Sequence, residues 1–197
     1  RAQQIHVETN EILRNPLNWL IYLDRYKATL TWAPNFAYGL IIEHSKEISK
    51  LDISLDNLKF ILNGGEAINY NACHEFLKIL SPKNLVYEAM KPSWGMTETS
   101  SGVLFSNNFG KIIYKNSVSV GKPIPGVQVR IVDENGNIVP KGEIGLLQVN
   151  GETINQGYYK NEEENRKTFT VDGWFDTGDY SKIINDEIVI TGRAKDI

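Results

Sequence analysis

The first half of the chain alternates between stretches with the apolar spacing of a helix and short apolar runs. Helices are expected over residues 16–27, over residues 35–46 and around residues 73–80. Strands are expected over residues 28–32, 58–62 and 85–89, the first of them buried. This order predicts an α/β fold with a mainly parallel sheet layer and covering helices.

Local signals set the boundaries of these elements. Pro16 suits the first turn of a helix, whereas Pro34 stops the apolar run before it. Cys73, Phe76 and Leu80 are spaced at i, i+3 and i+7, which places them on one face of an amphipathic helix. The chain therefore carries both the helix signals and the strand signals that an α/β layer requires.

From about Ser117 onward, alternate positions are apolar and turn residues recur, which indicates antiparallel strands. Asn135-Gly136 and Asn185-Asp186 are each expected to form a hairpin turn. A short helix is expected over residues 162–168. Asn161 can cap its start, and Glu164 lies three positions on, as in a capping box. We expect these elements to form a small antiparallel β-barrel-like subdomain beside the first layer.

Composition excludes some classes of function but does not identify the function. Apolar residues make up 41% of the 197 residues and charged residues 23%, as in ordinary globular proteins. The formal net charge of −3 gives no basic field, so nucleic acid is not expected as a partner. No apolar run reaches the roughly 20 residues of a membrane span, and the single cysteine, Cys73, favours a reducing, cytoplasmic setting.

Four short polar or glycine-bearing segments lie at the ends of apolar runs, where ligand-binding groups are found in α/β proteins. They are residues 63–66, 94–99, 175–179 and 192–196. In the first, Gly64 and Gly65 would let the backbone pass close to a flat ligand, although a plain turn is the alternative. Glu66 is a candidate ligand-binding residue only in combination with these glycines.

The second segment carries the most telling chemistry. Thr97 offers a hydroxyl to a phosphate oxygen, and Glu98 offers a hard oxygen ligand to Mg²⁺, which needs only one or two protein carboxylates. Trp94, just before Gly95 and Met96, offers an aromatic face on which a base could stack. For this segment taken alone, the alternative is a solvated loop with a core tryptophan.

The last two segments each supply one candidate ligand-binding side chain. Asp179, in the tight turn expected at residues 177–179, could accept the hydroxyls of a ribose, or it could merely cap that turn. Arg193 could donate to the same sugar or to a phosphate, or it could form a surface ion pair. The three histidines lack metal-ligand spacing with one another or with Cys73.

Together these segments resemble those of the adenylate-forming (AMP-binding) superfamily, which includes acyl-CoA synthetases and peptide-synthetase adenylation domains. The resemblance runs over nearly the whole chain. It rests on Asn63-Gly64-Gly65-Glu66-Ala67, Trp94-Gly95-Met96-Thr97-Glu98, Gly142-Glu143-Ile144-Gly145, Asn150-Gly151, Gly157-Tyr158-Tyr159, residues 172–179 and Gly192-Arg193-Ala194-Lys195-Asp196.

The resemblance implies roles for individual residues. Thr97 would contact the α-phosphate and Glu98 the Mg²⁺, which makes them the expected catalytic residues. Asp179 and Arg193 would hold the ribose, and Lys195 would be the hinge position. The expected ATP/AMP-binding residues are Gly64, Gly65, Glu66, Trp94, Gly95, Met96, Thr97, Asp179 and Arg193.

Within the superfamily, residues 15–20 and 31–38 resemble fatty acyl-AMP ligases and the acyl-activating modules of polyketide and nonribosomal peptide assembly lines. The extra segment of true fatty acyl-AMP ligases is not found between Glu98 and Val120. By the same resemblance, residues 33–38, 64–65 and 95–97 would border the pocket for the acid.

The implied function is that of an ATP-dependent carboxylic acid–AMP ligase. Such an enzyme passes its acyl group to the phosphopantetheine thiol of an acyl or peptidyl carrier protein. Two alternatives stay open. One is an acyl-CoA synthetase that transfers to coenzyme A, and the other is a non-catalytic nucleotide-binding or interaction domain.

The ends of the chain suggest a fragment. By resemblance, the glycine-rich phosphate loop is expected before Arg1 and the small lysine-bearing domain after Ile197, so the 197 residues alone are expected to be inactive. We expect the C-terminal half of an α/β subdomain over residues 1–116, a β-rich subdomain over residues 117–192 and the start of a hinge over residues 193–197.

Overall fold

The computed structural model describes residues 3–196, within which ten strands form one mixed sheet. The strands are β1 (Leu30–Ala33), β2 (Phe60–Asn63), β3 (Met90–Gly95), β4 (Gly102–Phe105), β5 (Ile113–Tyr114), β6 (Ser117–Pro123), β7 (Val127–Val132), β8 (Gly145–Gly151), β9 (Phe175–Ile184) and β10 (Glu187–Arg193). The helices are α1 (Thr9–Arg14), α2 (Leu17–Arg25), α3 (Asn35–Glu43), α4 (Ser45–Ile48), α5 (Tyr70–Leu80) and α6 (Glu162–Thr168). None of the helices in the described residues is long and apolar enough to cross a membrane.

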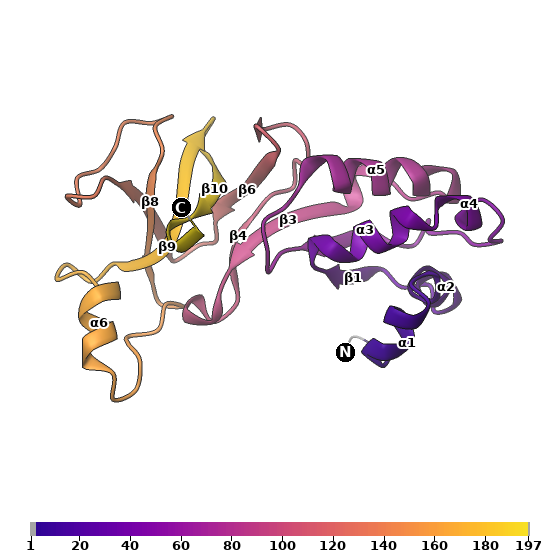
Figure 1. The fold of residues 1–197 in the computed structure, drawn as a ribbon, viewed down its shortest axis with the longest axis horizontal. Coiled ribbons are helices and arrows are strands. Elements are labelled where there is room, and N and C mark those ends of the chain that lie inside the picture. The colour runs from indigo at the N-terminus through magenta and orange to yellow at the C-terminus, as the bar shows by residue number, and fades with distance from the viewer. Residues whose placement is uncertain (1–2, 197) are drawn as a thin grey trace.

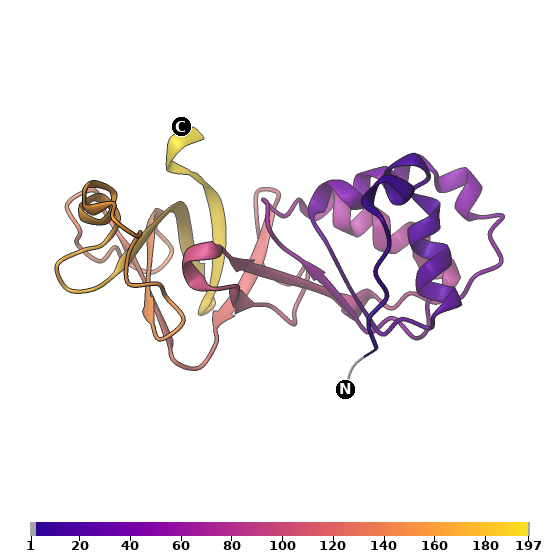
Figure 2. The same ribbon diagram turned by 90° about the horizontal axis from the view of Figure 1, so that it is seen from below.

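The molecule is elongated, with α1 to α5 gathered at one end and α6 at the other (Figures 1 and 2). The strand order across the sheet is β1-β2-β3-β4-β6-β10-β9-β8-β7, with β5 paired to β6 outside this path. The three strands β1, β2 and β3 are parallel, as the sequence predicts. The pairings from β4 onward are antiparallel.

Strand β3 joins the two parts of the sheet. Its first half pairs in parallel with β2, where Met90 lies opposite Ile61. Its second half pairs antiparallel with β4, where Ser93 lies opposite Phe105. Because β2 and β3 run in the same direction, their carboxyl ends lie at the same edge of the sheet. The first two candidate segments both begin at this edge.

Helices α2, α3 and α5 pack around an aromatic cluster. Its members are Trp19, Tyr38 and Phe76, whose ring centroids lie 4.8 to 6.1 Å apart. Tyr38 and Phe76 are fully buried, and aromatic burial of this kind dominates core energetics. Trp19 also donates its indole N–H to Thr31 Oγ1 at 3.1 Å, which attaches α2 to β1. Tyr38 is therefore part of the core between helices, and Cys73 lies on the buried face of α5 as predicted.

Two strand predictions are wrong in detail. Strand β1 is not buried, since Leu30 and Trp32 are 60% and 67% exposed at the edge of the sheet. The strand expected over residues 85–89 begins only at Met90, and a 3₁₀ turn precedes it. The apolar run before Met90 instead reflects burial of side chains such as Leu85 where the chain passes from helix to sheet.

The expected β-barrel is not closed. The antiparallel strands continue directly from the parallel ones, because β4 already pairs with β3 well before Ser117. Within the described residues, β7 forms the far edge of the sheet and is paired along its length with β8. The region is therefore the antiparallel part of one open sheet.

The predicted turns and the last helix form as expected. Asn185-Asp186 connects β9 to β10, and both residues have positive φ, as a two-residue hairpin requires. Asn135-Gly136 lies in the connection between the paired strands β7 and β8, with Gly136 at φ +81°. Asn161 accepts the N–H of Glu164 at 3.2 Å and thereby caps α6.

Gly39 lies inside α3, and a Cβ added there would meet no atom within 4 Å. Glycine in a helix interior costs about 1 kcal/mol relative to alanine. We therefore expect Gly39→Ala to raise the free energy of unfolding by about 1 kcal/mol and Tm by roughly 2–4 °C. Thermal and urea denaturation measure this, and a less stable variant would contradict the placement of Gly39.

Candidate functional site

The carboxylate of Asp179 connects three of the four candidate segments. Trp94 donates its Nε1–H to Asp179 Oδ2 at 2.8 Å, across 85 residues of sequence. Arg193 donates its Nε–H to Asp179 Oδ1 at 2.7 Å. Asp179 is only 4% exposed, and a buried carboxylate is stabilised by charge-assisted and indole donors of this kind. These segments therefore meet at one point of the molecule.

The backbone of β9 explains how Asp179 reaches this position. The sequence predicts a tight turn at residues 177–179, but the structure has a β-bulge inside β9, where the register with β8 shifts after Asp176. Gly178 has φ +68° and donates its N–H to Asp176 Oδ1 at 2.9 Å. A bulge re-aims the side chain beside it. On the other side, Asp179 lies directly opposite Arg193 of β10.

The two glycines after β2 differ in their surroundings. A Cβ added to Gly64 would lie 2.6 Å from Ser93 Oγ and 3.1 Å from Ser93 O, so the ends of β2 and β3 can approach only because this residue is glycine. Gly65 has φ +91°, and a Cβ there would meet no atom within 4 Å. The backbone at Gly65 thus borders open space beside β3.

Glu66 already has a partner within the chain. Its Oε1 accepts the backbone N–H of Phe36 at 2.6 Å. Phe36 lies in the first turn of α3, whose N-cap residue, Pro34, provides no side-chain hydrogen bond. The carboxylate therefore satisfies an otherwise unpaired amide at the start of α3. This contact gives Glu66 a structural role that the sequence did not indicate.

The loop after β3 is tightly constrained. A Cβ added to Gly95 would lie 2.1 Å from Ser101 O and 2.5 Å from Gly102 Cα, so the hairpin from β3 to β4 requires glycine here. The N–H of Met96 donates to Thr99 Oγ1 at 3.0 Å, and Thr99 is buried. These contacts hold the backbone of the loop that presents the expected catalytic residues.

Thr97 and Glu98 lie on this loop in different surroundings. Thr97 is exposed, and within residues 3–196 its hydroxyl makes no hydrogen bond. Glu98 is half-buried, and its Oε1 accepts the Tyr158 hydroxyl proton at 2.7 Å. Burial, together with the bond to Glu98, raises the pKa of Tyr158 to about 12. The phenol is therefore protonated at neutral pH and acts as the donor.

The backbone of Glu98 is held by the same neighbouring segment. Asn155 donates its N–H to the carbonyl oxygen of Glu98 at 2.8 Å, and Ser100 Oγ donates to the carbonyl of Thr153 at 2.8 Å. The sequence pattern gives no sign of this contribution of residues 153–158. No local spacing could reveal it, because Tyr158 and Glu98 are 60 positions apart.

Cys73 is a buried thiol with polar neighbours. It accepts the side-chain N–H of Asn63 at 3.0 Å and donates to Asn35 Oδ1 at 3.2 Å. Burial raises the pKa of Cys73 to about 12, which makes the thiol unreactive. In the described residues, no group of three or more His, Cys, Asp or Glu side chains could hold a metal ion.

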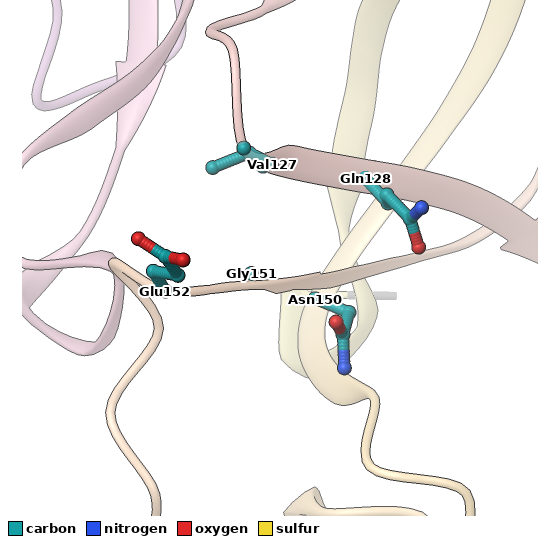
Figure 3. A pocket seen from close by; sticks show the side chains of 6 residues that line it. Val127, Gln128, Asn150, Gly151 and Glu152 are labelled. Carbon is teal, nitrogen blue, oxygen red and sulfur yellow. The ribbon is translucent and has the colours of Figure 1, made fainter.

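Two hollows in the surface lie apart from the predicted residues. The larger, of about 500 Å³, is lined by Gly126, Val127, Gln128, Asn150, Gly151 and Glu152. Figure 3 shows Gln128 and Asn150 on adjacent strands, with Glu152 beyond the end of β8. The second, of about 320 Å³, is lined by Tyr114, Lys115, Ser117, Ile144, Tyr180 and Thr191. None of the predicted nucleotide-binding residues lines either hollow.

Comparison with known proteins identifies the relatives of the chain. The family model described as AMP-binding enzyme matches residues 2–159. The nonribosomal peptide synthetase pngA of Aspergillus terreus is 33% identical over 204 residues, covering 99% of this chain and 22% of that protein. The McyG A-PCP structure complexed with phenylalanyl-adenylate superimposes with a TM-score of 0.92 at 40% identity, covering 98% of this chain and 35% of that one.

A second solved structure is similar to the chain over nearly the same length. The adenylation domain of a keto acid-selecting NRPS module, bound to keto acyl adenylate, has a TM-score of 0.90 at 36% identity, covering 96% of this chain and 40% of that one. Fatty acyl-adenylate ligases, at 23% identity and a TM-score of 0.85, share the fold. The chain spans about a fifth of the length of the curated relatives it matches.

Proposed function

Because this chain belongs to the AMP-binding enzyme family, we propose that the protein containing it joins a carboxylic acid to AMP with MgATP and releases pyrophosphate. The acyl group then passes from the adenylate to the phosphopantetheine thiol of a carrier protein, and AMP is released. The proposal rests on one observation: Trp94 and Arg193 both donate hydrogen bonds to the carboxylate of Asp179. Thr97 and Glu98 follow Trp94 within four residues, so the groups proposed to bind the phosphate and its metal ion lie close in sequence to this contact.

The reaction requires handling of like charges. A carboxylate must approach a phosphorus whose oxygens are already negative, so donors and cations must offset both charges. Thr97, whose hydroxyl is exposed, would donate to the α-phosphate. Asp179 would accept the ribose hydroxyls beside Arg193, and Gly65 would border the base. Holding the nucleoside in this way is an orientation effect on the rate.

The residues present fit a magnesium ion whose remaining ligands are water and phosphate oxygens. Glu98 supplies one carboxylate, and within residues 3–196 the hydrogen bonds of that carboxylate involve Oε1 alone. Magnesium commonly takes one or two protein carboxylates and completes its shell with water and phosphate. When bound, the ion would supply positive charge at the phosphate.

A carrier protein is the proposed acceptor, and a peptide-synthetase module is the proposed context. The similar proteins at 33–40% identity include a nonribosomal peptide synthetase, the McyG A-PCP protein and the adenylation domain of an NRPS module. Fatty acyl-adenylate ligases lie at 23% identity and support only the common fold. Amino and keto acids are therefore the first classes of substrate to examine, since such adenylates occur in two of the solved structures.

We also propose that the chain has two structural parts and the start of a hinge, over residues 1–116, 117–192 and 193–197. The change from parallel to antiparallel pairing supports two parts, although it occurs at β3 and β4 within one continuous sheet. Ile197 lies outside the described residues. A cytoplasmic location is proposed on the single free cysteine, Cys73.

Pyrophosphate exchange by the full-length protein tests the proposed function. With amino, keto, aryl and fatty acids offered in turn, we expect ATP- and Mg²⁺-dependent exchange with one class of acid. Mass spectrometry should then find the acyl group on a carrier protein. Thioester formation on coenzyme A instead would favour a free-standing acyl-CoA synthetase, and ATP binding without exchange for any acid would favour a non-catalytic domain.

A further inference from the structure

We propose that Tyr158 is a positioning residue that fixes the carboxylate of Glu98 in one orientation, and that α6 fixes Tyr158 in turn. The inference rests on the proposed function, because it gives Glu98 its place beside the phosphate. It goes beyond that function by assigning a role to a tyrosine, and to a helix, that lie 60 or more positions along the chain from Glu98.

The side chains of Tyr158 and Glu98 are in direct contact. The Tyr158 hydroxyl donates to Glu98 Oε1 at 2.7 Å, a distance typical of a short O–H to carboxylate bond. Asn155, three residues before Tyr158, donates its N–H to the carbonyl oxygen of Glu98. One segment therefore restrains both the backbone and the side chain of Glu98. A glutamate otherwise samples several rotamers, and ordering it on ligand binding costs free energy.

Tyr158 is itself held by a side chain of α6. Asn165 of α6 accepts the N–H of Tyr158 through Oδ1 at 2.6 Å and donates Nδ2–H to the carbonyl oxygen of Tyr158 at 3.1 Å. One side-chain amide thus satisfies both backbone groups of the tyrosine. Gly157 has φ +145°, and a Cβ there would lie 3.1 Å from Asn165 Oδ1, so this close approach favours glycine.

Further contacts restrain the ring and the helix. The ring of Tyr158 meets the edge of Phe169, with centroids 6.4 Å apart. Phe169 directly follows α6, whose start is capped by Asn161. The restraint therefore runs from a capped helix, through Asn165, to the phenol that holds Glu98.

The hydrogen bond from Tyr158 occupies only one of the two carboxylate oxygens of Glu98. A carboxylate has lone pairs on two oxygens, and a donor on Oε1 leaves Oε2 able to bind a cation. Groups that orient a metal-binding carboxylate from outside typically change metal affinity by about 10- to 100-fold when they are removed. Loss of the Tyr158 hydroxyl should therefore act on the binding of MgATP and not on the nucleotide alone.

The test compares the full-length protein with its Tyr158→Phe variant by titration calorimetry, using ATP with Mg²⁺ and ATP with EDTA. We expect the affinity for MgATP to fall about tenfold and the affinity for metal-free ATP to stay within about twofold. Tyr159→Phe is the matched control, because Tyr159 is the adjacent tyrosine and is 87% exposed. It should change neither affinity.

A second comparison separates positioning from general loss of structure. In a Glu98→Gln background, Tyr158→Phe should have almost no further effect on MgATP affinity, because the two residues act as one unit. The proposal is overturned if Tyr158→Phe leaves MgATP affinity unchanged, if it lowers both affinities equally, or if its effect adds fully to that of Glu98→Gln. If the wild-type protein exchanges pyrophosphate while any of these results is found, only the tyrosine role fails. If the wild type neither exchanges pyrophosphate nor binds MgATP more tightly than ATP, the proposed function and the tyrosine role fail together.

Discussion

Replacing Asp179 with asparagine should weaken MgATP binding by the full-length protein about 100-fold. The carboxylate accepts one donor on each oxygen, from Trp94 and from Arg193. Each oxygen has a second lone pair, which leaves acceptor capacity for the two hydroxyls of a ribose. In Asp179→Asn, an NH₂ group replaces one oxygen and faces a donor, and the charge is lost. Hydrogen bonds to charged groups are worth about 1.5–3 kcal/mol each, and 1.4 kcal/mol corresponds to tenfold in affinity.

Asp172→Asn is the matched control for this substitution. Asp172 also binds an arginine through both oxygens, with Arg130 nitrogens at 2.7 and 3.2 Å. The guanidinium holds the pKa of Asp172 down at about 2, but the carboxylate side chain is 60% exposed. Solvent-exposed ion pairs of this kind contribute little free energy. The affinity for MgATP should therefore change by less than about twofold. Equal effects of the two substitutions would contradict a special role for Asp179.

Gly95→Ala should be the most destabilising of the single substitutions considered. The added Cβ would lie 2.1 Å from Ser101 O and 2.5 Å from Gly102 Cα, and both neighbours are backbone atoms that cannot rotate away. Overpacking typically costs 1–3 kcal/mol, and a backbone clash lies at the upper end or beyond. We expect a loss of about 3 kcal/mol or more, which lowers Tm by roughly 6–12 °C.

Calorimetry or circular dichroism on the full-length protein measures this loss, and Gly39→Ala is the control of the same chemistry. A Cβ at Gly39 meets open space, so the control should be slightly more stable than wild type. Pyrophosphate exchange by Gly95→Ala should fall as well, because Gly95 lies between Trp94 and the loop that carries Glu98. A Gly95→Ala variant as stable as wild type would show that the β3–β4 hairpin has a different path.

The elements that the sequence predicted well are those with local causes. The buried face of α5, the cap at Asn161 and the hairpin at Asn185-Asp186 depend on residues only a few positions apart. The family assignment, made from short segments spread along the chain, is confirmed by the family match. These features need no knowledge of how distant parts of the chain meet.

The features that the sequence could not provide depend on tertiary contacts. Burial of β1 was expected from its apolar residues, but its position at the sheet edge leaves Trp32 exposed. The bulge that turns Asp179 toward Trp94 depends on the register of β9 with its neighbours. The contacts of Glu66 with Phe36 and of Tyr158 with Glu98 join positions 30 and 60 residues apart. No periodicity in the sequence carries such information.

We infer that segments far apart in sequence surround a single nucleotide at the carboxyl ends of β2 and β3. A crystal structure of the full-length protein with a non-hydrolysable acyl-adenylate analogue would show whether they do. We predict ribose hydroxyls about 3 Å from the carboxylate oxygens of Asp179, with the base beside Gly65 and the phosphate mimic next to Thr97. A nucleotide bound elsewhere, for instance in the hollow between Gly126 and Glu152, with Asp179 touching only Trp94 and Arg193, would contradict the claim.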